Sequence, residues 1–547
     1  MTRSSVCLLL VAVGTASADV QTLLTNYSDI PSSNITGYSL KWRPNSTAAF
    51  DRPALSPDGS YWLTRGNSED PSTLTDTFLV YGTGTAYGIV ARENDPIPTT
   101  GSSGLLAGEQ FGSFNPRRSI NDSGQFAFST PGRNTPSSQN YVVVRGQLLG
   151  SSAANFTAMA REAQALSVTG YSYNAGQFAD GVAMDANGRV MWISQRTPGF
   201  PVLDPREGIF IGNGTSNTLV AQTIDSNQSV PANQPVTGGI PWRSFSIQFG
   251  LDSAGASTLV LGYLGIGNFN TLALDNAVIL QQDAPLPDDA SLLVQTIAPG
   301  SVGLTPGTAG TPKWYCRGGF GGGSFSGTFG QVNGRTVAYA APSGTIVSCG
   351  TERWSSRGGS LSNIAANDRG DFVIAGGTDD MTRAPGDDEG IDIPGYIRDE
   401  VLVANNRVEL IREGDALDLD NNPATNEHCV VTDISTDTAV LTNDGWCYVV
   451  VATSRQAAIP TDPAVLGSAL IRVRVPRFCL ADVGSQGGAR GSDGLFDNND
   501  FVVFIDLFFS QSECADVGVQ GGVQGRDNAW DNNDFVVFID QFFTACN

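Results

Sequence analysis

The nonapeptide INDSGQFAF, residues 120–128, contains the pattern that decides the fold. An apolar residue is followed by Asn or Asp with a turn glycine, and then by alternating apolar side chains. The glycine supplies a positive φ for a tight turn, and the alternation gives the following strand one buried face. The same pattern recurs at LSPDGSYWL from Leu55, MDANGRVMW from Met184, LDSAGASTL from Leu251, AANDRGDFVI from Ala365 and LTNDGWCYVV from Leu441.

The copies are regularly spaced along the chain. From Gly59 to Gly255 the turn glycines are separated by 65, 64 and 67 residues, and a longer interval of 115 residues then leads to Gly370. That interval is long enough for a degenerate copy, and QVNGRTVAYA from Gln331 is the candidate. The sequence thus contains six clear units and one uncertain unit.

A second element recurs within the units and has the pattern of a β-hairpin. It is clearest in VLVANNRVELIREGDAL from Val401 and TFLVYGTGTAYGIVARENDPIP from Thr77, where two apolar runs flank a Gly or Asn turn and an acidic turn follows. Each period therefore holds three or four strands and no long helix. This combination predicts a mainly β fold, a six- or seven-bladed β-propeller, with a β-sandwich array or β-solenoid as the alternative.

Composition excludes several classes of function. The chain has 547 residues, enough for two to four domains, and its 31 Lys and Arg against 54 Asp and Glu give a net charge of −23. A chain this acidic repels phosphate backbones, so we expect no nucleic-acid partner. His428 is the only histidine, which excludes most histidine-dependent triads and metal sites built on several histidines.

The N-terminus has the features of an export signal. Arg3 precedes an apolar run from Val6 to Val13, and Ala16-Ser17-Ala18 forms an A-x-A cleavage site. We therefore expect a signal peptide at residues 1–18, no membrane span, and a secreted or extracellular protein, either free or attached to a cell surface. The expected domains are a propeller-like repeat domain at 19–475 and a small calcium-binding domain at 479–547.

Seven cysteines remain after cleavage, and in an exported protein disulfides are the expected use for them. Proximity in sequence suggests that Cys316 pairs with Cys349 and that Cys429 pairs with Cys447. The other three cysteines lie toward the C-terminus and cannot all pair with one another.

The second repeat is a near-identical duplication at an offset of 34 residues. ADVGSQGGARGSDGLFDNNDFVVFIDLFF starts at Ala481, and ADVGVQGGVQGRDNAWDNNDFVVFIDQFF starts at Ala515. Each copy has an Asp-rich loop followed by an amphipathic helical segment. In the first copy Phe501, Phe504, Ile505 and Phe508 are expected to share the apolar face, and Phe535, Phe538, Ile539 and Phe542 are their equivalents.

The two acidic loops predict calcium sites. Several carboxylates in one loop repel one another unless a cation lies among them, and hard oxygen ligands at this spacing select Ca²⁺. The alternative is a solvated acidic loop that caps a helix. The predicted ligands of two Ca²⁺ ions are Asp482, Asp493, the Leu495 carbonyl, Asp497 and Asp500, and Asp516, Asp527, the Ala529 carbonyl, Asp531 and Asp534.

At these residues the chain resembles dockerin domains, most closely the GC-type dockerins found at the C-termini of exported bacterial proteins. DGLFDNNDF from Asp493 and DNAWDNNDF from Asp527 correspond to the second half of the dockerin calcium loop. The departure is that Asp482 and Asp516 lie eleven residues before those positions rather than four. The resemblance implies binding of a cohesin-like or other anchoring protein, through Asn498, Asn499, Asn532 and Asn533.

The N-x-x-G-x-x-A-F motif, clearest at Asn121, is similar to that of exported tandem-repeat proteins with C-terminal anchor modules. We therefore expect a non-catalytic repeat protein, anchored to a scaffold or cell surface, whose repeat domain binds a carbohydrate or another surface ligand. The alternatives are a polysaccharide hydrolase or lyase that uses two carboxylates, for example from the acidic run 379–392, and a structural envelope component.

Overall fold

The computed structural model describes residues 20–30, 41–43, 49–98, 102–149, 154–166, 181–195, 207–223, 241–265, 269–286, 289–307, 312–320, 326–332, 335–340, 346, 352–355, 361–378, 400–406, 408–421, 428–435, 438–455, 465–475, 481–485, 487–490, 496–512, 514–524, 527 and 529–544. The predicted signal segment 1–18 and the acidic run 379–392 lie outside these residues.

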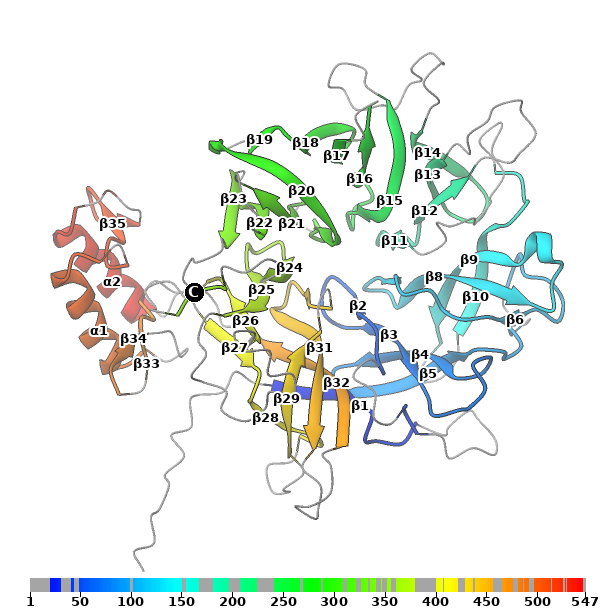
Figure 1. Ribbon diagram of the computed structural model, residues 1–547, viewed down its shortest axis with the longest axis horizontal. Helices are drawn as coiled ribbons and strands as arrows, with labels where there is room; N and C mark the ends of the chain where they lie inside the picture. The colour runs from blue at the N-terminus through cyan, green and yellow to red at the C-terminus, as the bar shows by residue number, and fades with distance from the viewer. Residues whose placement is uncertain are drawn as a thin grey trace, which may run out of the picture.

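Most of the chain forms a seven-bladed β-propeller, which confirms the mainly β prediction and gives the blade number (Figure 1). Each blade is an antiparallel sheet that runs outward from an inner strand, which has 10 residues in the fourth blade and 16 in the fifth and is shorter in most of the others. The first blade contains β2 (Ala54–Leu55), β3 (Trp62–Asn67), β4 (Thr77–Thr83) and β5 (Ala86–Arg92). The second contains β7 (Ser119–Ile120), β8 (Gln125–Arg133), β9 (Tyr141–Leu148) and β10 (Ala154–Arg161), with β6 (Gln110–Phe111) paired to β8 and the short 3₁₀ turn η1 (Ser137–Gln139) before β9.

The next three blades repeat the arrangement. The third contains β11 (Val182–Met184), β12 (Val190–Gln195), β13 (Glu207–Gly212) and β14 (Asn217–Gln222), and the fourth contains β15 (Trp242–Leu251), β16 (Thr258–Leu264), β17 (Phe269–Leu274) and β18 (Ala277–Gln281). The fifth contains β20 (Asp289–Leu304), β21 (Trp314–Phe320), β22 (Ser326–Val332) and β23 (Arg335–Ala340), with β19 (Pro285–Leu286) paired to β20.

The last two blades complete the ring. The sixth contains β24 (Leu361–Ala366), β25 (Phe372–Gly377), β26 (Glu400–Ala404) and β27 (Val408–Arg412). The seventh contains β28 (Ala416–Asp418), β29 (His428–Ile434), β30 (Val440–Leu441), β31 (Trp446–Arg455) and β32 (Val465–Arg474). Its outermost strand is β1 (Val20–Thr25), which pairs antiparallel with β32, so the two ends of the repeat domain close the propeller within one sheet.

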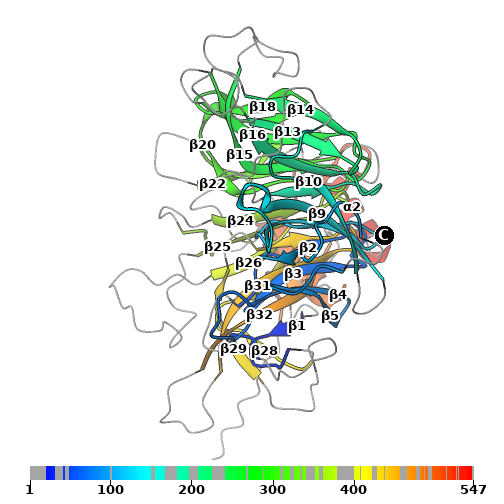
Figure 2. The same cartoon turned by 90° about the vertical axis from the view of Figure 1, so that its right-hand side faces the viewer.

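The hydrophobic core consists of the interfaces between neighbouring blades. Leu63 and Leu79 of the first blade pack against Phe126 and Phe156 of the second, and equivalent buried clusters join the later pairs. Trp62 of β3 packs against β31 and closes the circle, and these two strands lie next to each other in Figure 2. Because each large side chain stabilises by about 1.5–3 kcal/mol when buried, alternating apolar strands are sufficient to hold the blades together.

The glycine of each repeated motif has the backbone conformation expected from the sequence. Gly59, Gly124, Gly188 and Gly255 have φ between 68° and 77°, and the glycines of the last two blades, Gly370 and Gly445, have φ of 92°. The uncertain seventh unit was placed wrongly. QVNGRTVAYA falls in the outer hairpin of β22 and β23, whereas the turn that follows the inner strand of the fifth blade contains Thr305, Pro306 and Gly307.

Hydrogen bonds link these turns from blade to blade in a closed ring. Beginning at the first blade, the bonds are Asp58 N to Asp122 Oδ1 (2.9 Å), Asn121 Nδ2 to Asp185 O (3.1 Å), Ala186 N to Ser253 O (2.9 Å), Ser253 N to Pro306 O (2.6 Å), Gly307 N to Asp368 Oδ1 (2.8 Å), Asp368 N to Asn443 Oδ1 (3.0 Å) and Asn443 N to Pro57 O (3.0 Å). We call these residues the turn ring.

The predicted disulfide pairs are not formed. Cys447 lies opposite Leu441 and Val473, whereas Cys429 lies opposite Leu417 and precedes the part of β29 that pairs with the far end of β31. The two residues are therefore at opposite ends of one sheet. Cys316 is a free thiol on β21, and its predicted partner Cys349 lies outside the described residues. Burial raises the pKa values of the Cys316 and Cys447 thiols, the latter to about 12, so neither is a ready nucleophile.

After the propeller, the chain forms two loop–helix units, drawn in red in Figure 1. The first has β33 (Gly484–Ser485), β34 (Ala489–Arg490) and α1 (Asn498–Phe509), and the second has β35 (Gly518–Val519), β36 (Val523–Gln524) and α2 (Asn532–Thr544). We call residues 481–544 the tandem module. With 12 and 13 residues, its helices are too short to span a bilayer, and the described residues contain no other helix that could do so.

Candidate functional site

The last predicted ligand of each loop, Asp500 or Asp534, ties the loop to its helix. Asp500 Oδ1 accepts the backbone N–H groups of Val483 and Gly484, both at 2.8 Å, and Oδ2 accepts that of Asp497 at 3.0 Å. Asp534 does the same with the N–H groups of Val517, Gly518 and Asp531, at 2.7, 2.8 and 2.9 Å. Both carboxylates are fully buried, so these bonds are needed to offset the loss of water.

Asp497 begins α1 as its N-cap, and Asp531 precedes α2 in the same way. Each accepts the backbone N–H two residues later, from Asn499 or Asn533, at 2.7 Å. With Asp500 at the third helical position, the first loop forms a reciprocal capping box. The predicted interpretation of these segments as capped helices is therefore confirmed.

The remaining predicted ligands are spread along the loops. Asp482 and Asp516 are buried, and Asp516 Oδ1 accepts the backbone N–H of Asp527 at 3.1 Å. Asp527 is exposed and accepts the N–H of Ala529 at 3.0 Å. Asp493 and Leu495 lie outside the described residues. Within the described residues, no three Asp, Glu, His or Cys side chains gather as a metal-binding cluster, and the calcium sites stay a prediction.

The first loop holds two buried carboxylates close together. Burial raises the pKa of Asp500 to about 6, and the negative charge of Asp482 adds to this effect, whereas the three backbone N–H groups oppose it. The exposed fractions of Asp482 and Asp500 are 3% and 0%. A cation beside them would relieve the repulsion and the desolvation that the loop now carries.

The predicted partner-binding asparagines lie at the start of each helix. Asn498 and Asn532 are exposed, whereas Asn499 and Asn533 are half-buried. Asn533 Oδ1 accepts the N–H groups of Gly521 and Gly522, at 3.2 and 3.1 Å, so this side chain also holds the β35–β36 turn. Asn498 and Asn532 are therefore the members of the set best placed to contact a partner.

The predicted apolar faces form most of the contact between the helices, since Phe504 and Phe538 are buried and Phe508, Phe535, Ile539 and Phe542 pack against the same core. Val503, Phe504 and Leu507 are the buried apolar residues of α1, while Phe501 is 40% exposed at the edge of the interface. Phe504 and Phe538 stack with their ring centroids 3.9 Å apart and join the two helices at the centre of the module. The pattern of aromatic residues alone did not reveal that valine and leucine occupy the interface.

Other apolar side chains lie on the surface at equivalent positions of both helices. Val502 and Val536 are 60% and 55% exposed, and Phe509 and Phe543 are both 76% exposed. Each pair is separated by the 34-residue offset of the duplication. We call these four residues the exposed apolar set.

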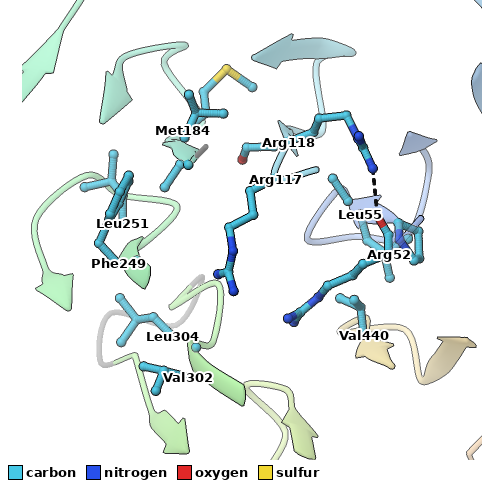
Figure 3. A pocket seen from close by; sticks show the side chains of 18 of the residues that line it. Arg52, Leu55, Arg117, Arg118, Met184, Phe249, Leu251, Val302, Leu304 and Val440 are labelled. Atoms are coloured by element: carbon cyan, nitrogen blue, oxygen red, sulfur yellow. Dashed lines mark hydrogen bonds between the residues drawn. The ribbon is translucent and has the colours of Figure 1, made fainter. Parts of the chain in front are cut away.

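A second candidate site lies in the propeller, in a cavity of about 210 Å³ between the inner strands (Figure 3). It is lined by residues of the first to fifth blades and of the seventh, including Leu55, Met184, Leu251, Leu304 and Val440. About half of its wall is apolar. We call it the channel cavity.

The described residues that line the channel cavity include three arginines, Arg52, Arg117 and Arg118, and no Asp or Glu. Arg118 is buried and held in place by the wall itself, because its Nη1 donates to Asn115 O at 2.9 Å and its Nη2 to Arg52 O at 3.1 Å. In Figure 3 the side chains of Arg52 and Arg117 extend into the cavity instead.

Sequence reasoning missed this site, although a signal was present. Arg52 and Arg117 lie seven residues before the turn glycines Gly59 and Gly124, so they occupy the same repeat position in neighbouring blades. An alignment of the repeats on their glycines would have placed both side chains at the same level of the propeller axis.

The carboxylates of the repeated hairpins have structural partners. Arg161 forms a two-pronged ion pair with Glu109, at 2.8 and 2.7 Å, and Arg412 pairs with Glu352 and Glu409. Arg133 pairs with the buried Glu93. Each bond joins segments of one blade or of neighbouring blades.

No protein-family model matches the chain, and no curated protein matches it. Among solved structures it is similar to the β-propeller domain of the trilobed protease from Pyrococcus furiosus, with 10% identity over 69% of this chain and 86% of that chain and a TM-score of 0.34. It is also similar to a putative TolB from Agrobacterium tumefaciens (10% identity, 54% and 81% covered, TM-score 0.28) and to an α-L-arabinanase from Penicillium chrysogenum (11% identity, 70% and 96% covered, TM-score 0.27). These similarities concern the fold alone.

Proposed function

We propose that this chain is an exported, non-catalytic binding protein that is attached to a scaffold or cell surface through its tandem module, in a calcium-dependent manner. The observation that carries the proposal is the exposed apolar set. Val502, Phe509, Val536 and Phe543 contribute little to the module's own core, and exposing them to water is unfavourable. Their presence at equivalent positions of both units is explained if each helix offers the same surface to a partner.

The partner in this proposal is an anchoring protein of the cohesin-like kind, with an apolar surface that covers the set. Asn498 and Asn532 lie exposed at the helix starts and would add polar contacts at the rim. An apolar centre with a polar rim is the usual composition of a protein interface. The 34-residue repeat offers the partner two equivalent orientations of binding.

Calcium would act on the loops rather than on this surface. The predicted donors are carboxylate and carbonyl oxygens, which suit Ca²⁺, and a cation would relieve the repulsion between the buried carboxylates of Asp482 and Asp500. In the second loop the exposed Asp527 and Asp531 would have to turn toward the ion. Binding would thus order the loops and fix the relative position of the two helices.

The attachment test measures retention of the full chain on envelope preparations from the native cells, with calcium and after chelation. The expected result is calcium-dependent retention that is lost when Phe509 and Phe543 are both replaced by Asp. Leu74→Asp is the matched control, because Leu74 is 53% exposed but lies on the propeller. Equal retention of the double variant would contradict the proposed attachment surface.

A separate titration tests the metal. Calorimetry of the full chain with Ca²⁺ should give saturable binding that is weakened in Asp527→Asn/Asp531→Asn, while Asp540→Asn, an exposed change on α2, should behave as the unmodified chain does. Absence of saturable heat would remove calcium from the proposal. Turnover of a polysaccharide by the full chain would instead favour the enzyme alternative.

A further inference from the structure

The electrostatics of the channel cavity differ from those of the rest of the chain. Acidic residues outnumber basic ones by 54 to 31 overall, yet the lining residues that the structure describes include three arginines and no carboxylate. Asp51, behind the wall, is shared between two guanidinium groups: its Oδ2 lies 2.8 Å from Arg65 Nε and 3.4 Å from Arg118 Nη1. One carboxylate cannot neutralise both, so a positive charge remains at this side of the cavity before Arg52 and Arg117 are considered.

The opposite wall provides a polar group that faces the arginines. Tyr315, on β21, also lines the cavity, and burial raises the pKa of its hydroxyl, whereas the charges of Arg52 and Arg117 both lower it. A Cβ on Gly303 would lie 2.2 Å from Cζ of Tyr315, so the glycine leaves the space that the phenol ring needs. The hydroxyl and the two guanidinium groups are thus brought to one place by the first, second and fifth blades.

In the absence of a ligand, the positive charges of the cavity arginines repel one another, which is unfavourable. Burial lowers the pKa of Arg118 to about 10, and the charge of Arg65 acts in the same direction, while Asp51 opposes both. Positive groups held together in a partly apolar cavity repel one another, and an anion that entered would relieve this repulsion. Arginine is also the side chain that binds planar or tetrahedral oxyanions with two parallel hydrogen bonds.

We propose that the channel cavity is a binding site for a small oxyanion, a carboxylate or a phosphate, carried on an apolar body. Arg52 and Arg117 hold the anionic group, with the Tyr315 hydroxyl beside it, and Phe249, Leu251, Val302 and Leu304 enclose the apolar part. Arg118 contributes charge from the wall and fixes the backbone of Arg52. The volume of about 210 Å³ limits the enclosed part of the ligand to a few non-hydrogen atoms beyond the anionic group.

The site is built by the propeller alone and does not depend on the tandem module, so this inference and the proposed attachment can fail separately. The orientation of the ligand follows from the positions of the two arginines. Arg52 and Arg117 belong to neighbouring blades, and the equivalent positions of the third, fourth, sixth and seventh blades carry Gly181, Gln248, Asn363 and Thr438. The anionic group is therefore held at one side of the cavity and the apolar body extends toward the fourth and fifth blades.

Three probes separate the parts of the proposal. Calorimetry of the full chain is performed with hexanoate, which has both the anionic group and the apolar body, with hexanamide, which lacks the charge, and with inorganic phosphate, which lacks the body. Hexanoate is expected to bind most tightly and less tightly as salt is raised, because the attraction between charges is screened. Phosphate binding as tight as that of hexanoate would overturn the role of the apolar wall, and hexanamide binding as tight would overturn the role of the arginines.

The variant Arg52→Gln/Arg117→Gln is expected to weaken hexanoate binding by about tenfold or more, because hydrogen bonds to charged groups are lost. Arg490→Gln is the matched control, an exposed arginine of the tandem module that should leave the affinity unchanged. Thermal melting verifies that each variant is folded, and Leu304→Asp, which places a negative charge in the wall, is the second variant if the double change does not fold. Unchanged affinity for hexanoate in a folded Arg52→Gln/Arg117→Gln or Leu304→Asp variant would overturn the proposal. The absence of saturable hexanoate binding at millimolar concentration would do so as well.

Discussion

The turn ring of the propeller and the two units of the tandem module are both internal repeats, but different features are repeated in each. In the turn ring the backbone geometry recurs while the side chains change. The fifth blade lacks the motif altogether, and Pro306 and Gly307 still continue the hydrogen bonds from Ser253 to Asp368. In the tandem module the side chains themselves recur, down to the exposed Phe509 and Phe543.

The difference separates the requirements of folding from those of binding. A tight turn can be closed by several residue types, provided that a positive φ and a few acceptors are available, so the sequence of a turn can vary. An exposed phenylalanine is not required by any turn or core. Its repetition is accounted for by a surface that two units present in the same way.

The largest expected effect in this comparison comes from Asp500→Ala or Asp534→Ala. Each change leaves three buried backbone N–H groups without their acceptor, and the expected loss is about 3–5 kcal/mol, enough to unfold a small module. Hydrogen exchange should increase throughout α1 and α2 and remain unchanged in the propeller. If both helices stayed protected from hydrogen exchange in the variants, the carboxylates would not be needed to hold each loop to its helix. Asp540→Asn is the control.

A smaller effect is expected from Asn121→Ala in the turn ring. The Asn121 side chain closes its own turn by accepting the N–H groups of Ser123 and Gln125, and it donates to the carbonyl of Asp185 in the next blade. Its loss should destabilise the propeller by about 2 kcal/mol, measured as a lower midpoint of thermal unfolding. The exposed Ser137→Ala serves as control, and an equal midpoint for both would argue against a stabilising ring.

The pH dependence of the module should be of similar size. The pKa of Asp500 is about 6 when folded and near 4 when unfolded, so between these values the folded state binds more protons. The stability of the module should therefore fall by about 2 kcal/mol as pH rises from 4 to 6 and level off above about pH 7, as far as this group is concerned. Hydrogen exchange of α1 across this range checks the sign.

Two comparisons sharpen this pH prediction. Asp500→Asn, which keeps an acceptor but does not ionise, should remove the dependence. Added Ca²⁺ should be bound more tightly as pH rises through about 6, because the ion competes with the proton for the same loop. A stability that rises with pH in the absence of calcium would contradict the burial-driven shift.

The smallest effect is expected where the two units already differ. Arg490 of the first unit pairs with Asp506 at 2.8 Å, and the equivalent residues of the second unit are Gln524 and Asp540. Because both members of the pair are well exposed, Arg490→Gln should change the stability of the first unit by less than about 0.5 kcal/mol. A larger loss by hydrogen exchange of α1 would mean that the units are not equivalent in their folding.

Much of the fold was predictable because its signals are local. The glycine turns, the alternating strands and the hairpins depend on neighbouring residues, and each appears in the structure where the motif occurs. The degenerate fifth blade was misplaced because its turn, from Thr305 to Gly307, has no motif, and only the position of the inner strand β20 identifies it. The disulfide predictions failed because distance along the chain did not measure distance across the sheet that holds Cys429 and Cys447.

By itself, the amino-acid sequence determined the class of the propeller, the existence of its repeated turns and the two capped helices, because turn chemistry and hydrophobic periodicity act between near neighbours. Only the tertiary structure decided that seven blades close through β1 and β32, that the carboxylates of Asp500 and Asp534 face backbone N–H groups, and that Arg52, Arg117 and Tyr315 meet in one cavity. These residues lie up to hundreds of positions apart, and the closing of the ring brings them together.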